Sequence, residues 1–307
     1  MSRWGEVGNH IITFAKGKII TLAKQAHNSK LFSAVLFTFH RFYGIIQLID
    51  KLELDGEKMD YYKQIFKRKS FHIFKNTDTL TEGEVQGLKD FIKTTKPLNP
   101  EIKTEICIVP ESETTCKRGG QYCILFYSET KGEYLRNIGY IGEQIDLYLA
   151  SQNIGALWFG IGKPQNMQVN GLDFVIMISI AKMPEDMFRK DMFKSKRNPL
   201  NEIWIGDTLR VAEIVRFTPS ACNTQPWIVE NTSNNLMIYR FKKPGKRGIM
   251  PADKVRYYNK IDMGIFLFML EVCLEHESYT YERTLFADTT EDSIEQTLIA
   301  KYTYSNK

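Results

Sequence analysis

Two kinds of apolar pattern recur along the chain after residue 58. Apolar side chains at helical spacing predict helices that begin near residue 59 and cover 81–94, 138–153, 209–216 and 261–274. Short apolar runs predict strands at 106–109, 122–127, 156–159, 172–180, 227–230 and 236–241. Helix 261–274 is apolar almost all round, so it should be buried. Because it is the counterpart of helix 138–153, the two halves of the chain look like a degenerate internal repeat.

Local signals mark the ends of two of these helices. Thr81 stands at the expected N-cap, and Glu84 follows it at the spacing of a capping box. Gly155 stands just after helix 138–153, where a glycine commonly stops a helix. These signals support the predicted boundaries independently of the apolar pattern.

The first 58 residues differ in character from the rest. The apolar stretch 31–49 is interrupted by His40, Arg41 and Gln47, which makes it a poor membrane-spanning helix. It also lies too far from the start to be a signal peptide. An amphipathic helix packed on the body, a weak membrane-surface segment and translation from an upstream start all remain open. We expect a helical extension over 1–58 that the chemistry does not need.

Composition narrows the class of protein. The chain has 307 residues, of which 43% are hydrophobic, and a net charge of +5, so a soluble globular protein with a real core is expected. The cationic clusters 189–197 and 240–247 are solvated faces or anion-binding sites. The five cysteines form no Cys-x-x-Cys pair, so we expect neither a metal site nor a disulfide framework, and a reducing cytoplasm.

One turn stands out, between helix 209–216 and strand 227–230. Pro219 and Pro226 prevent the helix from continuing, while Ser220 and Asn223 can hydrogen-bond to nearby backbone or to a ligand. A plain connector between a helix and a strand has the same composition, so both interpretations stay open. Cys222 lies inside the turn, and we expect it to be a small buried residue rather than a nucleophile.

Two further segments have candidate chemistry. In the string 67–74, cationic side chains beside a serine suit a phosphate, although a solvated helix end has the same pattern and His72 fits an edge histidine. The glycines of Gly160-Ile161-Gly162 follow a predicted buried strand and let backbone approach a ligand, as they also would in an ordinary tight turn.

Taken together, these strings resemble motifs of the FMN-dependent nitroreductase family. Residues 219–227 are similar to the family's Pro-Ser-Ser-x-Asn-x-Gln-Pro-Trp turn. Residues 67–74 resemble its Arg-Arg-Ser-x-Arg/Lys-x-Phe opening, with His72 at a place where the family has Arg or Lys. Residues 139–164 resemble the helix, strand and glycine turn beside the flavin, and 194–200 resemble an Arg-x-Pro-Leu segment. The resemblance covers residues 59 to about 301.

The resemblance implies roles for individual residues. It places Arg68, Lys69 and Arg197 on the FMN phosphate, with Ser70 on the phosphate or ribityl chain. It places Asn223 at the edge of the flavin ring. The remaining implied contacts with FMN come from the two turns and the histidine, namely His72, Gly160, Ile161, Gly162, Pro219, Ser220 and Ala221. No catalytic side chain and no metal ligand is implied.

Each half lacks the motif that the other keeps. The first half has Lys96-Pro97-Leu98-Asn99-Pro100 where the family has its Pro-Ser-Ser turn, and the second half has no Arg-Lys-Ser string. In the family, two identical subunits build two flavin sites across their interface. We therefore expect an α+β nitroreductase-like fold with lobes over 59–200 and 201–307, each a mostly antiparallel sheet flanked by helices. This monomeric pseudo-dimer would bind one FMN.

The function implied is a flavin-dependent oxidoreductase. NAD(P)H would reduce FMN, and a nitroaromatic, quinone or similar small electron-poor acceptor would reoxidise it in a ping-pong cycle. No nucleic acid and no stable membrane insertion is expected. Two alternatives stay open: a flavin-binding protein of the same fold with other or no redox activity, and a basic module that binds nucleic acid or membrane.

Overall fold

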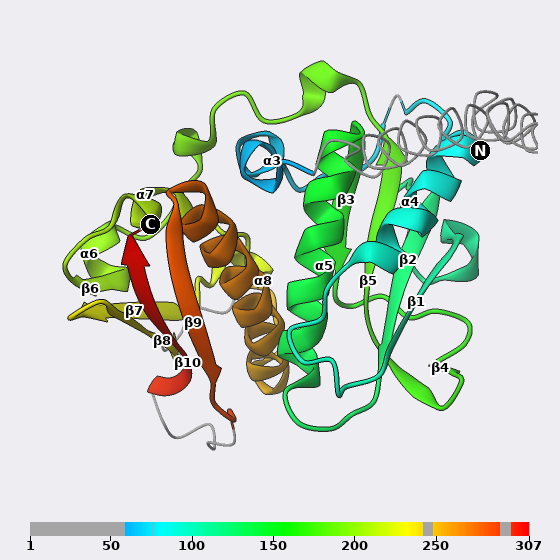
Figure 1. The fold of residues 1–307 in the computed structure, drawn as a ribbon. Coiled ribbons are helices and arrows are strands. Elements are labelled where there is room, and N and C mark those ends of the chain that lie inside the picture. The colour runs from blue at the N-terminus through cyan, green and yellow to red at the C-terminus, as the bar shows by residue number, and fades with distance from the viewer. Residues whose placement is uncertain (1–58, 76, 242–247, 289–295, 307) are drawn as a thin grey trace, which may run out of the picture. The chain divides into compact units, whose positions relative to one another are not determined.

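Two five-stranded sheets contain all the strands in the part of the chain that the structure describes (Figure 1). This computed structural model describes residues 59–75, 77–241, 248–288 and 296–306. The first sheet has the order β1-β2-β5-β3, with β4 paired to β5. Its strands are β1 (Thr104–Pro110), β2 (Tyr122–Ser128), β3 (Ile154–Phe159), β4 (Gln168–Val169) and β5 (Leu172–Lys182). The second has the order β6-β7-β8-β10-β9. Its strands are β6 (Trp204–Gly206), β7 (Trp227–Thr232), β8 (Asn235–Phe241), β9 (Tyr279–Leu285) and β10 (Gln296–Asn306).

The helices of residues 60–307 differ greatly in length. The α-helices are α3 (Tyr61–Lys67), α4 (Glu82–Thr94), α5 (Tyr134–Ser151), α6 (Leu200–Ile203), α7 (Arg210–Val215) and α8 (Val255–His276). Single 3-10 turns occur at Glu111–Glu113, Glu185–Met187, Met192–Lys194, Ala221–Asn223 and Ala252–Lys254. Only α5 and α8 are both long and buried over most of their length.

The two sheets share one strand order. Strands β7, β8, β10 and β9 follow one another in the second sheet as β1, β2, β5 and β3 do in the first, and all these neighbours pair antiparallel. The second sheet has one addition, because β6 pairs with β7 in parallel. Strand β6 comes directly after β5, the last strand of the first sheet, and it already belongs to the second sheet.

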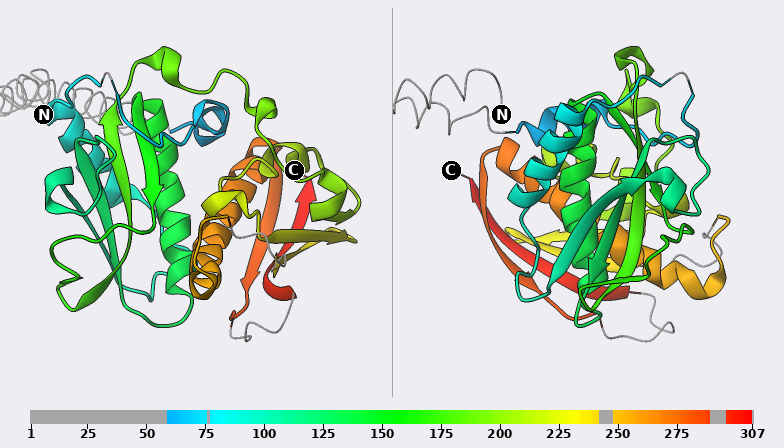
Figure 2. Two further views of the ribbon diagram at one scale, coloured as in Figure 1. Left: turned by 180° about the vertical axis from the view of Figure 1, so that it is seen from behind. Right: turned by 90° about the vertical axis from the view of Figure 1, so that its right-hand side faces the viewer.

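Helices α5 and α8 pack against each other between the two sheets (Figures 1 and 2). Their backbones touch, because a Cβ at Gly139 would clash with the carbonyl of Ile261, and a Cβ at Gly264 would clash with the carbonyl of Arg136. Each glycine meets the carbonyl that lies three residues before the other glycine. The contact is therefore self-complementary, like a two-fold interface between identical subunits.

The same interval along the chain recurs in other contacts. Three pairs of positions are separated by the same number of residues along the chain. These are the crossing glycines at 139 and 264, the buried acids at 146 and 271, and the residues at 158 and 283 that donate to those acids. Trp158 Nε1 donates to Asp146 Oδ2 at 2.9 Å, and Arg283 Nη1 donates to Glu271 Oε1 at 2.6 Å. Each bond joins a central helix to the strand that follows it. The interval also links the last residues of α5 and α8 and the first residues of β3 and β9.

One hydrophobic cluster runs through both sheets and both central helices. Trp227 and Phe266 are fully buried, and their rings stack with centroids 4.9 Å apart. Ile138 and Ile145 of α5 belong to the same cluster. Since burial of large apolar side chains is the main stabilising term in folding, the two sheets form one cooperative core.

Most elements predicted from the sequence are confirmed, but the structure adds several others. The first helix ends at Lys67, because Arg68 turns into an extended conformation and Ser70 forms a parallel bridge with Ala156. Strands β4, β6, β9 and β10 and the short helix α6 were not predicted. Along β9 exposed and half-buried residues alternate, which is the pattern of a strand with one face in contact with the protein.

Two sequence predictions lie outside the described residues. These are the helical extension over 1–58 and, apart from its first two residues, the cationic cluster 240–247. Within the described ranges, no helix is both long and apolar enough to cross a bilayer.

The capping box at the start of α4 permits a direct test. Thr81 Oγ1 accepts the N–H of Glu84 at 3.2 Å, and Glu84 Oε2 accepts the N–H of Thr81 at 2.9 Å. We expect Thr81→Ala to lower the free energy of unfolding by about 1 kcal/mol, measured by urea denaturation. Thr94→Ala, at the exposed other end of the helix, is the control and should change it by less than about 0.5 kcal/mol. Equal effects of the two changes would contradict the role of the cap.

Candidate functional site

The site begins with a buried arginine at the end of α3. Nε and Nη2 of Arg68 both lie 2.8 Å from Oδ2 of Asp146 on α5. Burial alone would lower the pKa of Arg68, but the charges of Asp146 and Glu143 and the hydrogen bond to Asp146 raise it above its ordinary value. Asp146 also accepts the indole N–H of Trp158. The guanidinium is therefore fixed and fully charged.

Two further guanidinium groups gather beside Arg68. Arg189 is held by its backbone N–H, which donates to the carbonyl of Lys67 at 3.1 Å. Burial lowers the pKa of Arg189 to about 10, and the charge of Arg68 adds to the effect. Burial lowers the pKa of Arg197 to about 10 as well, helped by the charges of Arg189 and Arg68. The three arginines, called the arginine cluster below, repel one another and carry more charge than Asp146 offsets.

The nearby carboxyl of Glu143 does not balance this charge. Glu143 is fully buried on α5, and burial raises its pKa well above the ordinary value, with the charge of Asp146 adding to the effect. Burial therefore favours its neutral form, which offsets little of this positive charge. Among the described residues, Nε of Arg197 is buried without a hydrogen-bond partner. An excess of positive charge with an unused donor is suited to an anion with several oxygens, such as a phosphate.

Arg197 connects this cluster to the turn before β7. Its Nη1 donates to Oδ1 of Asn223 at 3.0 Å, and its Nη2 donates to the carbonyl of Phe217 at 3.2 Å. The next residue, Asn198, donates its N–H to Oε1 of Gln225 at 2.8 Å. The structure thus brings together the segment after β5 and the turn 217–225, which the sequence placed at opposite ends of one ligand.

The turn itself is held in an unusual backbone conformation. Cys222, Asn223 and Gln225 have φ angles of 49°, 56° and 50°, in the left-handed region that few residues adopt. Oγ of Ser220 accepts the N–H of Gln225 at 2.9 Å, and Oδ1 of Asp262 on α8 accepts the N–H of Ala221 at 2.9 Å. The turn is thus held by two side-chain acceptors, one on Ser220 of the turn itself and one on Asp262 of α8.

The expectation that Cys222 is buried is wrong. Its side chain is exposed, and it is the only exposed one of the five cysteines. Its backbone is in the left-handed region, with a φ angle of 49°, and its small side chain is not packed in the core. Pro219, Ser220, Ala221 and Asn223 are all half-buried at the same surface.

The glycine turn after β3 meets the second sheet's central helix. Tyr258 of α8 donates its hydroxyl to the carbonyl of Gly160 at 2.8 Å, and its ring lies where a Cβ on Gly160 would be. Any Cβ on Gly162 would lie 2.7 Å from Sδ of Met177. Burial raises the pKa of Tyr258, and the nearby charge of Cys222 adds to the effect. Tyr258 therefore lies between the glycine turn and the turn 217–225, while Ile161 is 66% exposed beside them.

The remaining predicted residues have other contacts. Nζ of Lys69 donates to the carbonyl of Met187 at 2.7 Å and lies over the ring of Phe71. Ser70 contacts β3 through its backbone bridge to Ala156. His72 is exposed. None of the hydrogen bonds found among the described residues joins the side chains of Lys69, Ser70 or His72 to the arginine cluster.

Sequence reasoning missed four residues of the site. Arg189 was present in a cationic cluster, and its place became clear only from its neighbours in space. Asp146, Tyr258 and Asp262 lie on the two long helices, and Asp146 and Asp262 are acids within their buried stretches. A charged residue inside such a helix is itself a signal, because buried charges are rare unless they are paired.

The fold and the site define an α+β protein of the nitroreductase type. The family model described as "Putative TM nitroreductase" matches residues 60–273. The chain belongs to this family, and the resemblance noted in its motifs is confirmed. No curated protein shows significant sequence similarity to it.

Similar solved structures include three described as nitroreductases, and the first of them supports the fold. One from Thermotoga maritima, described as a "putative nitroreductase", is 18% identical, covers 80% of this chain and 94% of its own, and has a TM-score of 0.50. A protein of the same description from Desulfovibrio desulfuricans, in complex with FMN, is 14% identical over 48% of this chain and 97% of its own, with a TM-score of 0.38. A nitroreductase with bound FMN from Desulfitobacterium hafniense is 12% identical over 46% and 98%, with a TM-score of 0.34.

Proposed function

We propose that this protein is an FMN-dependent oxidoreductase with one composite flavin site. The observation that carries the proposal is the hydrogen bond from Arg197 to Asn223, which joins the arginine cluster to the turn 217–225. One of these elements suits the phosphate of FMN and the other suits the edge of its ring. Their direct contact supports a single site to which both elements contribute.

Individual residues have distinct tasks in this proposal. The arginine cluster (Arg68, Arg189 and Arg197) would bind the phosphate, and Nε of Arg197 would gain an acceptor. Asn223 and the backbone of 219–221 would contact the ring from the second half of the chain. Gly160, Ile161 and Gly162 would line the ring from the first half, with the ring of Tyr258 packed against Gly160 and Met177 against Gly162.

The bound flavin would supply the redox chemistry by taking a hydride from NAD(P)H and passing electrons to an electron-poor acceptor such as a nitroaromatic or a quinone. The protein binds and orients the reactants. The exposed side chain of Ile161 would offer an apolar surface to an acceptor. No side chain of the site is needed as a general acid or base in this proposal.

We infer that the chain is a pseudo-dimer of two lobes, over 59–200 and 201–307. The shared strand order of the two sheets supports this inference, as does the constant interval from 139 to 264, 146 to 271 and 158 to 283. The self-complementary crossing of Gly139 and Gly264 would correspond to the two-fold axis of a dimer. Such a chain is expected to be a monomer in solution.

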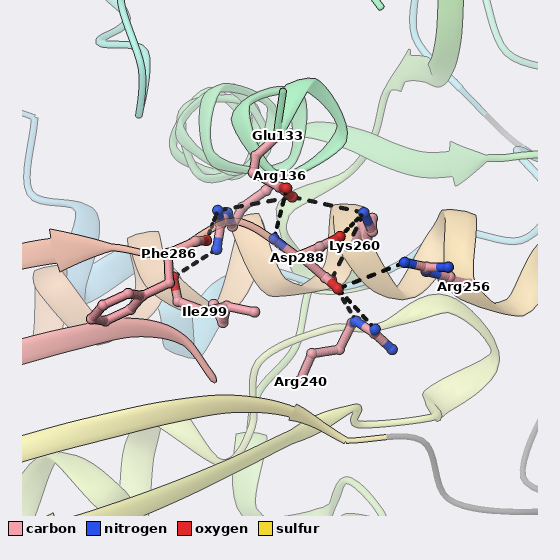
Figure 3. A network of polar contacts seen from close by, with 8 residues as sticks. All are labelled: Glu133, Arg136, Arg240, Arg256, Lys260, Phe286, Asp288 and Ile299. Atoms are coloured by element: carbon pink, nitrogen blue, oxygen red, sulfur yellow. Dashed lines mark hydrogen bonds and ion pairs between the residues drawn. The ribbon is translucent and has the colours of Figure 1, made fainter. Parts of the chain in front are cut away.

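The second flavin position of this pseudo-dimer would be filled by the protein itself. The same interval takes Tyr258 back to Glu133 and Gly160 forward to Leu285. Oε1 of Glu133 accepts the N–H of Asp288 at 2.8 Å, and the Asp288 carboxylate is bound by Arg240 (Figure 3). Arg136 also donates to the carbonyls of Phe286 and Ile299. A network of charged groups thus takes the place that would face a second ring.

The first experiment is to measure bound flavin. We expect purified protein, supplied with FMN, to absorb in the visible range and to release about one FMN per chain on denaturation. Bleaching of the flavin by NAD(P)H without oxygen, and its recovery on adding a quinone, would support the oxidoreductase. Two FMN per chain would overturn the single site. Flavin that NAD(P)H does not bleach would leave a flavin-binding protein without this activity, and no bound flavin would overturn the proposal.

A further inference from the structure

A buried acid lies directly beneath the turn 217–225. Asp262 of α8 is 3% exposed, and its Oδ1 accepts the N–H of Ala221 at 2.9 Å. Its other oxygen, Oδ2, is buried and has no hydrogen-bond partner among the described residues. A buried polar atom without a partner destabilises a protein, so its presence calls for an explanation.

The other half of the chain has an equivalent contact with different chemistry. The interval that relates Gly139 to Gly264 also relates Asn137 to Asp262. Asn137 is fully buried on α5, and its Oδ1 accepts the N–H of Asn99 at 3.0 Å. Asn99 lies in the string 96–100, where the first half lacks the Pro-Ser turn. Nδ2 of Asn137 is likewise buried without a partner among the described residues.

Asn137 and Asp262 both anchor backbone, but only Asp262 can ionise. Asp262 and Asn137 each use one side-chain oxygen to accept a backbone N–H from the segment that precedes a strand. An amide is therefore sufficient to anchor such a segment. The protonated carboxyl of Asp262 and the amide of Asn137 have almost the same shape. An acid is therefore required only if its ability to gain or lose a proton is used on the side that has the candidate flavin turn.

We propose that Asp262 is a positioning residue that holds Ala221 and its turn against the flavin ring and keeps a removable proton beneath it. The proposal rests on the proposed function. Its ligand is the flavin ring, which gains negative charge when it is reduced, so a neutral Asp262 adds no second negative charge beneath the ring, whereas an ionised Asp262 would oppose the reduced form. Asn137, on the side without a flavin, has no such task.

The surroundings of Asp262 agree with a neutral acid. The groups that face it are the Ala221 N–H and the hydroxyl of Thr224 from the turn, with Asn259 from its own helix bonded to Thr224. Beyond them, the titratable groups at the turn are Cys222 and Tyr258. Burial raises the pKa of Asp262 from 3.8 to about 8, although the hydrogen bond from the Ala221 N–H and the nearby hydroxyl of Thr224 oppose the shift.

Because the pKa of Asp262 is raised in the folded protein, the free energy of unfolding depends on pH. Between pH 4 and pH 8 the folded protein holds a proton on Asp262 that the unfolded chain has released, so stability falls as pH rises through that window. Glu143 acts in the same direction, because its pKa is also raised. The difference between the wild type and Asp262→Asn isolates the contribution of Asp262, since an amide does not titrate.

The test compares Asp262→Ala and Asp262→Asn with Asn137→Ala, the matched control. FMN affinity is measured by quenching of flavin fluorescence at pH 6 and pH 9. The rate at which a small aromatic disulfide reacts with the exposed thiol of Cys222 reports the order of the turn without any flavin. We expect Asp262→Ala to weaken FMN binding and to speed the thiol reaction by about tenfold each. Asn137→Ala should change both by less than about twofold while lowering the urea midpoint to a similar extent.

Asp262→Asn keeps the test decisive if the alanine variant does not fold. At pH 6 it should bind FMN about as tightly as the wild type, because the amide mimics the neutral acid. Between pH 6 and pH 9 its FMN affinity and urea midpoint should change less than those of the wild type. Equal behaviour of the Asp262 and Asn137 variants, or an unchanged pH dependence in Asp262→Asn, would overturn the proposal. A wild type without flavin would instead overturn the proposed function, and the Cys222 rates would still judge whether Asp262 holds the turn.

Discussion

Replacing Asp288 with asparagine is expected to lower the free energy of unfolding by about 3–5 kcal/mol, the usual cost of leaving a buried charge without its partner. Asp288 is 3% exposed, and its carboxylate accepts Nε and Nη2 of Arg240 at 2.6 and 2.9 Å. Arg256 and Lys260 lie 4.0 Å from the same carboxylate (Figure 3). With asparagine, the buried Arg240 loses its counter-charge, and the partly exposed Arg256 and Lys260 lose a nearby carboxylate.

The measurement is urea unfolding followed by tryptophan fluorescence. Asp253→Asn is the control, because Asp253 pairs with Lys254 at 3.8 Å on the surface and should contribute less than about 1 kcal/mol. A double change, Asp288→Asn with Arg240→Met, should recover part of the loss by removing one uncompensated charge. The interpretation fails if Asp288→Asn costs no more than the surface control.

Replacing Arg197 with alanine is expected to weaken FMN binding by about 100-fold or more. Loss of a charge-assisted, partly buried contact with a phosphate typically costs about 2–5 kcal/mol. Arg197 also joins the cluster to Asn223 and Phe217, so its removal separates the two ends of the proposed site. Arg197→Lys should restore only part of the affinity, because an ammonium group lacks the planar fork of a guanidinium.

The matched control for Arg197 is Lys194→Ala in the same segment. The side chain of Lys194 is 85% exposed and forms only a 3.9 Å pair with Asp191, so FMN affinity should change by less than about twofold. Affinity is measured by titration of FMN fluorescence, with unfolding checked for each variant. If Arg197→Ala and Lys194→Ala bind FMN alike, the arginine cluster does not hold the phosphate.

The sequence predicted much of the fold because periodicity reports burial directly. Helix α5 was predicted because its apolar residues recur at helical spacing, and α8 because it is apolar almost all round. Strand β5 was predicted because it is a continuous apolar run, as expected of a strand buried on both faces. Strands β9 and β10 were missed, since polar and charged residues alternate with the apolar ones along β9. A short alternating pattern with a polar face is easily taken for a loop.

The site was predictable only where its residues share a motif. The turn 217–225 and Arg197 were located by their strings, and the structure joins them. The partner of Arg68 is 78 residues away in α5, and the acid beneath Ala221 is 41 residues away in α8. No local pattern relates such positions, because only the packing of α5 against α8 and the sheets brings them together.

The constant interval between the two halves has a consequence for how this protein changes. In a dimer of identical subunits every substitution is made twice, so a residue that closes one site closes both. In the proposed pseudo-dimer each substitution is made once. Glu133 and Tyr258 occupy matching positions, as do Asn137 and Asp262, yet each pair has diverged. One of the two composite positions can thus be closed by the protein itself while the other stays free to recognise a ligand, and mutations designed for one helix leave the other as it was.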